Sequence, residues 1–416
     1  MKYSTRVVTL MAVTFGIVGL ERMVIAFVMP GIQQEFNLSY TQVGAIVSVF
    51  GFTWAIGSWL MGSISDYVGR RVVLVTLMIF GGVCSWLTGI AGSFIMLVLV
   101  RGVMGFAEGG VASPIFAVVA EESLPQSRAR NMSLTTGLMV LFGGAIGPIL
   151  STALMAHFGW RPVFYIYALP AVFMGILILL FVREPASTLA AIKARKEGRG
   201  KRLDAQGREV RYADAFKNRN VIMLAFIWVA QMIWLWLFTT FGVMFLVKVH
   251  KLPITTMGMI MTAFGIGVFL GSLCFGLLAD RIGRRTVLVV TLTVGGLFGL
   301  LFASLQPGAS LVVIAAAVFL YSCTSGGAGG TLITMGAESV GPLLAATATG
   351  FINGFGELVG GGIFPTIGGG IADWLGLSTT LYVAGAISIA AGVIACFLRE
   401  TLERRKAAAF GAATAG

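Results

Sequence analysis

Five ionisable side chains lie inside long apolar stretches of this sequence. They are Glu21, Arg22, Arg101, Glu108 and Glu357. An ionisable group near the middle of a membrane costs from about 2.5 to more than 10 kcal/mol, depending on how it is measured, so such groups are usually retained for a function. A carboxylic acid can alternate there between a protonated and an ion-paired state, and a guanidinium can bind a carboxylate or a phosphate. These residue types therefore indicate proton transfer and anion binding.

The spacing of these residues limits the directions in which they can point. Glu21 and Arg22 are adjacent in the apolar segment 7–30, so on a helix they point about 100° apart and cannot both face one partner. We expect Arg22 to face a central cavity and Glu21 to face the fourth span, or the reverse. Arg101 and Glu108 are seven residues apart and share one helix face, about 10 Å apart along the axis. A purely structural charge network between the two spans is the alternative.

The composition places these residues in a polytopic membrane protein. Hydrophobic residues make up 57% of the chain and charged residues 11%, whereas a soluble domain carries about 25% charged residues. Twelve apolar segments are each long enough to cross a bilayer. The four cysteines and two histidines show no metal-ligand spacing, and there is no glycine-rich phosphate loop. We therefore expect no metal, no cofactor and no enzyme active site.

The net charge of +12 follows the membrane topology and does not indicate nucleic-acid binding. If both termini lie on one side, all but five of the 29 basic residues gather there. The five exceptions are Arg22, Arg101, Arg161, Lys248 and Lys251. Because basic loops stay in the cytoplasm, this asymmetry predicts a multi-pass protein of the inner (plasma) membrane, with both termini cytoplasmic.

A repeated motif divides the chain into two halves. Residues 62–71 read GSISDYVGRR and residues 276–285 read GLLADRIGRR, while the ends of the two halves read VREP at 182–185 and LRET at 398–401. The pattern predicts an internal duplication. We expect a six-helix bundle over 1–183, a basic linker over 184–219, a second six-helix bundle over 220–400 and a tail over 401–416.

The paired loops resemble the hallmark of twelve-helix transporters of the major facilitator superfamily, and the resemblance covers essentially the whole chain. It implies an all-α membrane protein whose two bundles rock about a midplane site, an architecture that needs no partner, so we expect a monomer. In that superfamily the loops gate the cytoplasmic side, although here Tyr67 replaces a usual basic residue; the alternative is that the loops only set topology. The implied gating residues are Asp66, Arg70, Arg71, Asp280, Arg284 and Arg285.

The charged spans resemble the anion:cation symporter branch, which includes sialic acid, galactonate, hexuronate and vesicular glutamate carriers. The resemblance implies that Arg22 binds a substrate carboxylate, that Glu21 and Glu108 carry protons, and that Arg101 tunes Glu108. Glu357 departs from the branch, where an asparagine often precedes the glycine-rich run of the eleventh span. Glu357 could bind a hydroxyl or amino group of the substrate, add a second proton, or pair with Arg22.

Further polar side chains on the seventh, tenth and eleventh spans are weaker candidates for substrate binding, since single Trp or Ser residues in membrane helices more often serve packing. Gln231 is the best of them, because a buried amide needs partners. The candidates are Gln231, Trp234, Tyr321, Ser322 and Asn353.

The sequence thus predicts secondary active transport of a small organic acid, coupled to protons and working by alternating access. A proton-coupled exporter of drugs or other amphipathic compounds is the alternative within transport, but Arg22 argues against it. An anion exchanger would use the same residues. A membrane receptor or enzyme is disfavoured because no motif in the sequence supports an active site.

Overall fold

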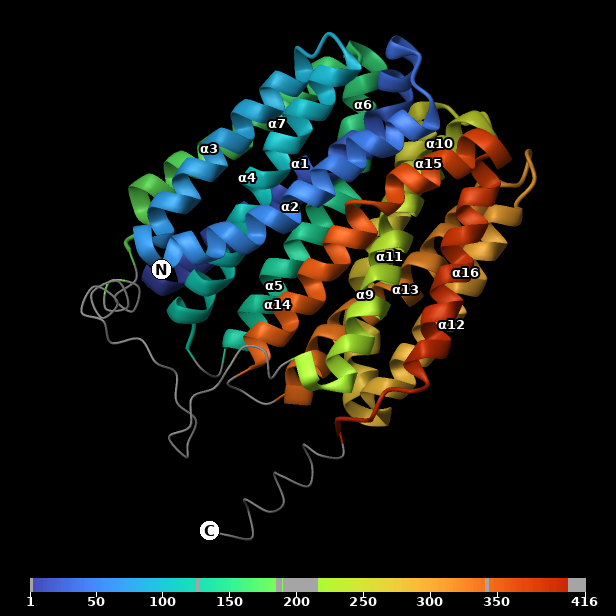
Figure 1. The fold of residues 1–416 in the computed structure, drawn as a ribbon. Coiled ribbons are helices and arrows are strands. Elements are labelled where there is room, and N and C mark those ends of the chain that lie inside the picture. The colour runs from blue at the N-terminus through green and yellow to red at the C-terminus, as the bar shows by residue number, and fades with distance from the viewer. Residues whose placement is uncertain (1–2, 125–126, 185–188, 190–215, 341–343, 403–416) are drawn as a thin grey trace.

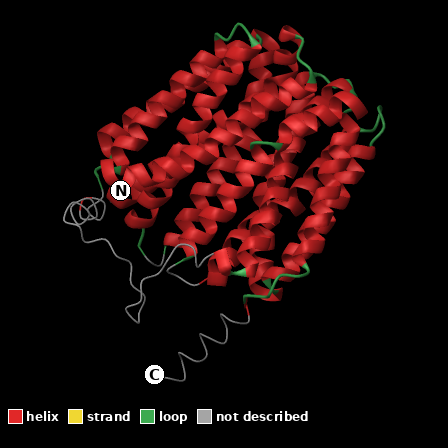
Figure 2. Cartoon of the chain, in the orientation of Figure 1, coloured by secondary structure: helices red, strands yellow, loops and turns green. Residues whose placement is uncertain are grey.

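We analysed a computed structural model that describes residues 3–124, 127–184, 189, 216–340 and 344–402. Within this part the chain forms helices joined by short loops (Figure 2). Most of the predicted basic linker over 184–219 and of the tail over 401–416 lies outside the described residues, so those two boundaries stay predictions. Eleven segments of the described chain are long and apolar enough to cross a membrane. The all-α fold is confirmed.

The first half contributes six spans, of which the fifth consists of α5, η1 and α6. Its helices are α1 (Tyr3–Phe36), α2 (Tyr40–Val68), α3 (Arg70–Gly89), α4 (Phe94–Glu122), α5 (Arg128–Val140), the π-helix η1 (Leu141–Ile146), α6 (Gly147–Phe158) and α7 (Trp160–Phe181).

The second half repeats this arrangement, with a seventh span made of α9, η3 and α10. Its helices are α9 (Arg219–Leu237), η3 (Phe238–Gly242), α10 (Val243–Lys248), α11 (Ile254–Ile282), α12 (Arg284–Ser304), α13 (Leu311–Val340), α14 (Ala345–Gly356), η4 (Glu357–Gly361), α15 (Phe364–Leu375) and α16 (Leu377–Ala395).

The eleventh span is present but interrupted, which is why only eleven continuous segments are found. It consists of α14, η4 and α15, and its glycine-rich stretch at 360–365 reads GGGIFP. The corresponding stretch of the fifth span, 143–148, reads GGAIGP and overlaps η1. Proline removes a backbone donor, and glycine lowers the preference for a regular helix, so both spans widen into π-helical turns at the same place. Such turns are frequent at functional sites.

The two halves touch closely at the end of the bundle away from the chain termini. Gly44 of α2 lies against the Pro365 carbonyl group of α15, where an added Cβ would come within 2.1 Å of the oxygen. Gly265 of α11 lies equally close to Gly144 of η1. Figure 1 shows α2 beside α15 at this end, with the N-terminus at the other. Glycine is required at these positions because backbone meets backbone.

The halves are less tightly joined toward the end that carries the termini. Gly350 and Gly354 of α14 have no described atom within 4 Å of the position that a Cβ would take. The large apolar cluster that joins both halves does not include Gly350 or Gly354; it includes Phe27 of α1 with Phe238 and Phe241 of η3. The structure is therefore closed at one end, between α2 and α15 and between α6 and α11, where Gly258 lies against Thr152.

The short motifs at the ends of the two halves, around Glu184 and Glu400, have a common structural role. The Glu184 carboxylate accepts hydrogen bonds from the backbone N–H groups of Arg70 (2.6 Å) and Arg71 (3.0 Å) at the start of α3. Glu400 accepts the equivalent bonds from Arg284 and Arg285 at the start of α12, both at 3.0 Å. A carboxylate there satisfies two donors that the helix leaves unpaired and opposes the helix dipole. In each half, the motif at the end of the half therefore binds the loop motif that precedes the third helix of that half.

Candidate functional site

Arg22 of α1 and Glu357 of η4 form an ion pair between the two halves. Nη2 of Arg22 donates to both carboxylate oxygens of Glu357, at 2.7 and 2.8 Å. The guanidinium also lies over two indole rings, 4.0 Å from the ring centroid of Trp54 on α2 and 4.9 Å from that of Trp236 on α9. Neither Arg22 nor Glu357 is more than 5% exposed. The first half therefore contains a buried cation, Arg22, which already binds the carboxylate of Glu357.

Glu21 points away from this pair. It lies beside Ser85 of α3 and Arg101 of α4, which are its polar neighbours. Of the two orientations that the sequence allowed, the structure has Arg22 facing the contact between the halves and Glu21 facing the fourth span. The angle of about 100° between consecutive residues on a helix keeps the two side chains apart.

Arg101 and Glu108 lie on α4 and are almost fully buried. The Arg101 guanidinium lies 4.2 Å from the ring centroid of Phe50, and its Nη1 is 3.3 Å from Sδ of Met104. Nε of Arg101 and both carboxylate oxygens of Glu108 have no hydrogen-bond partner among the described residues. The two side chains interact through space but make no direct ion pair in this conformation.

The weaker candidates lie elsewhere in the second half. Gln231 donates to the Ser325 carbonyl oxygen at 2.8 Å and so ties α9 to α13. Trp234 and Tyr321 pack edge to face, with their ring centroids 5.2 Å apart. Ser322 bonds within α13 and lies against Gly267 of α11, and Asn353 is exposed on α14. The structure does not bring these five side chains to Arg22.

Of the aromatic partners of the two arginines, Trp236 is a weaker candidate from the sequence, whereas Phe50 and Trp54 were not selected as site residues. Trp54 lies one helical turn after Phe50, so α2 presents one ring to Arg22 and the other to Arg101. Trp236 follows Trp234 by two residues and therefore points to a different side of α9. The sequence signal was a pair of aromatic residues four apart on a span next to charged spans. That pattern alone does not distinguish cation binding from packing.

Three of the predicted gating residues, Arg70, Asp280 and Arg284, form ion pairs at the end of the bundle that carries the duplicated loops. In the second copy, Arg284 donates to Asp280 at 2.6 Å and to Glu338 of α13 at 3.0 Å. In the first copy, Arg70 pairs with Glu121 of α4, and Arg71 donates to the Leu179 carbonyl oxygen. The side chain of Asp66 lies outside the description. Glu121 and Glu338, which sequence reasoning missed, hold matching places on the fourth and tenth spans.

A carboxylate at the opposite end links the halves a second time. Asp373, at the exposed end of α15, accepts hydrogen bonds from the backbone N–H groups of Tyr40 and Thr41, both at 2.8 Å, and from the Thr41 hydroxyl at 2.6 Å. These donors belong to the start of α2, so Asp373 opposes the dipole of a helix from the other half. Burial alone would raise the pKa of Asp373, but the hydrogen bonds from Thr41 and Tyr40 outweigh it and lower the pKa.

Replacing Asp373 by asparagine should weaken the closure between α2 and α15. A lowered folded-state pKa means that the stabilisation is fully present above the ordinary aspartate pKa of about 3.9 and is lost only as the pH falls below it. Between pH 5 and pH 8 the wild-type link should therefore not change. Losing the charge at an exposed helix start removes about 0.3–1 kcal/mol.

The distance between spin labels at the ends of α2 and α15 measures this closure. We expect Asp373→Asn to increase the population with a long distance at both pH values. Glu35→Gln is the control, because Glu35 pairs at the same end with Arg161 and Trp160 of its own half. An unchanged distance distribution in Asp373→Asn would contradict the role of the link.

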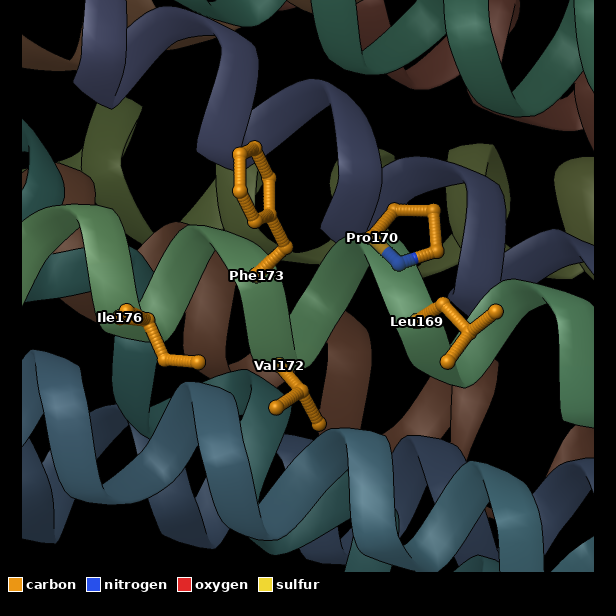
Figure 3. Close-up of a pocket in the computed structure, with 5 residues that line it drawn as sticks. All are labelled: Leu169, Pro170, Val172, Phe173 and Ile176. Carbon is orange, nitrogen blue, oxygen red and sulfur yellow. The ribbon is translucent and has the colours of Figure 1, made fainter.

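Two shallow apolar grooves lie on the outer faces of the described bundle. One is lined by residues of α7 (Figure 3), namely Leu169, Pro170, Val172, Phe173 and Ile176. The other lies between α2 and α4 and includes Val49, Thr53 and Phe106. Their apolar lining suits lipid chains, and neither groove is lined by one of the five buried charged residues.

Apolar spans arranged in two halves around a buried cluster of charges define a polytopic membrane protein. Residues 11–365 match the Major Facilitator Superfamily, and the chain belongs to this superfamily. Solved structures agree with the fold. A bacterial homolog of the human lysosomal transporter Spinster, in an inward-facing and occupied conformation, superposes with a TM-score of 0.77 at 17% identity, over 95% of this chain and 97% of that one.

Several curated relatives are transporters of organic acids by name. The hexuronate transporter of Bacillus subtilis is 28% identical over 64% of this chain and 62% of that relative's length. The probable sulfoacetate transporter SauU of Cupriavidus necator is 25% identical over 66% of this chain and 65% of its own length. The sialic acid transporter NanX of Escherichia coli is 23% identical over 88% of this chain and 86% of its own. The first two matches thus span less than two thirds of those relatives.

Proposed function

We propose that this transporter carries an organic carboxylate across the membrane together with protons. The observation that carries the proposal is the buried Arg22, whose guanidinium already holds a carboxylate group, that of Glu357, between two indole rings. A substrate carboxylate would find the same donor and the same rings. The relatives named for hexuronate, sulfoacetate and sialic acid all handle compounds that carry an acidic group.

The balance of charge in the buried cluster supports proton coupling. Two arginines face three carboxyl groups, so at least one carboxyl group is uncompensated unless it carries a proton. Glu357 rests on Arg22, and Glu21 lies beside Arg101. Glu108 has both oxygens buried without a hydrogen-bond partner among the described residues. Because an unpaired buried carboxylate is very costly, Glu108 is the best place for a proton, with Glu21 next to it on the same side.

Alternating access follows from the two ends of the bundle. The α2–α15 and α6–α11 contacts close one end, and we propose that they open while the duplicated loops of the two halves approach each other and close the other end. In this proposal Asp66, Arg70, Arg71, Asp280, Arg284 and Arg285 act as the gate on the cytoplasmic side, where both termini lie. Movement of one half against the other about a midplane site is the general mode of such transporters.

A binding screen tests the proposed substrate class directly. We expect glucuronate, N-acetylneuraminate or sulfoacetate to raise the melting temperature of the purified protein, because a ligand that binds only the folded state stabilises it. Amides or alcohols of the same carbon skeletons serve as matched controls and should give no shift. Stabilisation by cationic amphipathic compounds, with none by the acids, would contradict the proposal and favour a drug exporter.

A further inference from the structure

Glu357 competes with any substrate for the cation that would bind it. Its two oxygens take Nη2 of Arg22 at 2.7 and 2.8 Å, and the two residues come from opposite halves of the chain. The pair is buried, so a substrate carboxylate that takes the same Nη2 donor must displace Glu357. A carboxylate that binds Arg22 must therefore release Glu357, which then lies in a dry site without its counter-charge.

Among the described residues, Arg22 is the cation with which Glu357 pairs. The helices packed against η4 are α2, α9, α14 and α15, and their charged residues lie toward the helix ends, at Asp66, Arg219 and Asp373. The side chains around the Arg22–Glu357 pair are Trp54 of α2 and Trp236 of α9, neither of which titrates. The remaining charged groups of the cluster are Glu21, Arg101 and Glu108. The Arg101 guanidinium lies over the ring of Phe50, one helical turn before Trp54 on α2, and near Glu21.

Substrate binding changes the count of charges by one. With two arginines and three carboxyl groups, one proton balances the cluster; a substrate carboxylate makes four carboxyl groups against the same two cations. An ionised carboxylate left without a partner in a low-dielectric site is strongly disfavoured, whereas the protonated acid is not. One further proton must therefore enter with each substrate carboxylate.

We propose that Glu357 takes up this proton when the substrate carboxylate displaces it from Arg22. The proton comes from water on the side to which the site is open and binds a carboxylate oxygen of Glu357. When the substrate leaves on the other side, Glu357 gives the proton to water there and returns to Arg22. Glu357 thus competes with the substrate carboxylate for Arg22, and this competition couples the movement of one proton to that of one substrate carboxylate. This inference rests on the proposed function.

The experiment counts the protons taken up on binding. Purified protein is titrated calorimetrically with glucuronate, N-acetylneuraminate and sulfoacetate at pH 6 and pH 8, each in two buffers of different ionisation enthalpy. We expect Glu357→Gln to take up one proton fewer per bound acid than the wild type. At pH 8 we also expect Glu357→Gln to bind at least about tenfold more tightly, since the glutamine does not compete as an anion.

Two further variants separate this role from a loss of structure. Glu357→Asp keeps the carboxyl group and should keep the wild-type proton count. Asp373→Asn removes the other carboxylate link between the halves and leaves Arg22 untouched, so it should also keep the count. If Asp373→Asn lost the same proton, the effect would come from loosened halves and the inference would be wrong.

The remaining outcomes distinguish the inference from the proposed function. Weaker binding by Glu357→Gln at both pH values would show that Glu357 is a direct ligand of the substrate, and equal proton counts would show that it does not couple. Either result overturns the inference. The proposed function would still stand if substrate binding were weakened in Arg22→Lys. If none of the three acids bound to the wild type, the proposed function would fail and the inference with it.

Discussion

Replacing Arg22 by lysine is expected to weaken binding of the transported carboxylate by about 30- to 150-fold, corresponding to about 2–3 kcal/mol. A lysine ammonium is a point charge on a flexible stem, so it loses both the planar guanidinium geometry and the stacking between Trp54 and Trp236. Binding measured by calorimetry and uptake into proteoliposomes both report the change. The charge itself is conserved, so a large loss identifies geometry as the cause.

Arg161→Lys is the control for this substitution. Arg161 also pairs with a carboxylate and lies over an indole ring, that of Trp160, but at the exposed end of the first half. We expect little change in uptake for Arg161→Lys. Normal uptake by Arg22→Lys would remove Arg22 from the proposed binding site.

Glu108→Gln is expected to keep substrate exchange and to lose the part of proton-driven accumulation that depends on the Glu108 proton. Glutamine has nearly the shape of a protonated glutamic acid, so the buried cluster keeps its packing and its charge balance with that proton in place. It cannot release the proton, so a pH gradient can drive net uptake only through the proton that Glu357 is proposed to carry. We expect counterflow at rates close to the wild type, with accumulation under a pH gradient well below the wild-type level.

Proteoliposomes loaded with substrate measure counterflow, and a pH jump measures accumulation. Glu35→Gln, which removes an exposed carboxylate far from the cluster, should behave as the wild type in both assays. Unimpaired accumulation by Glu108→Gln would assign the driving proton elsewhere in the cluster, with Glu21 as the next residue to test.

Glu357 has a different role from Glu108 in these proposals, and the two variants can be told apart. Glu108 lies within the first half without a hydrogen-bond partner among the described residues, whereas Glu357 crosses between the halves to Arg22. Glu108→Gln should remove the proton that Glu108 moves and keep the one that Glu357 takes up, whereas Glu357→Gln should do the reverse. The double variant should show no accumulation driven by a pH gradient.

The class of protein and the arrangement of its spans could be predicted because they depend on local properties. A run of about 20 apolar residues crosses a bilayer whatever its neighbours are. The duplicated loops reveal two halves because glycine, carboxylate and arginine recur at the same short spacings. The family match and the helices of the structure confirm the class of protein and its all-α fold. Even the eleventh span was located correctly, although its glycine-rich centre interrupts the helix.

The partners of the buried charges were decided only by the tertiary structure. The sequence showed that Glu21 and Arg22 face different ways, but not which way each one faces, because the rotation of a span about its axis depends on what it packs against. It left three roles open for Glu357 and did not select Trp54, and it showed no link between Asp373 and the start of α2. Each of these contacts joins residues that are distant in the chain, most of them from opposite halves. The spacing of residues along the chain carries no information on how the two bundles pack against each other. It is this packing that brings Glu357 to Arg22.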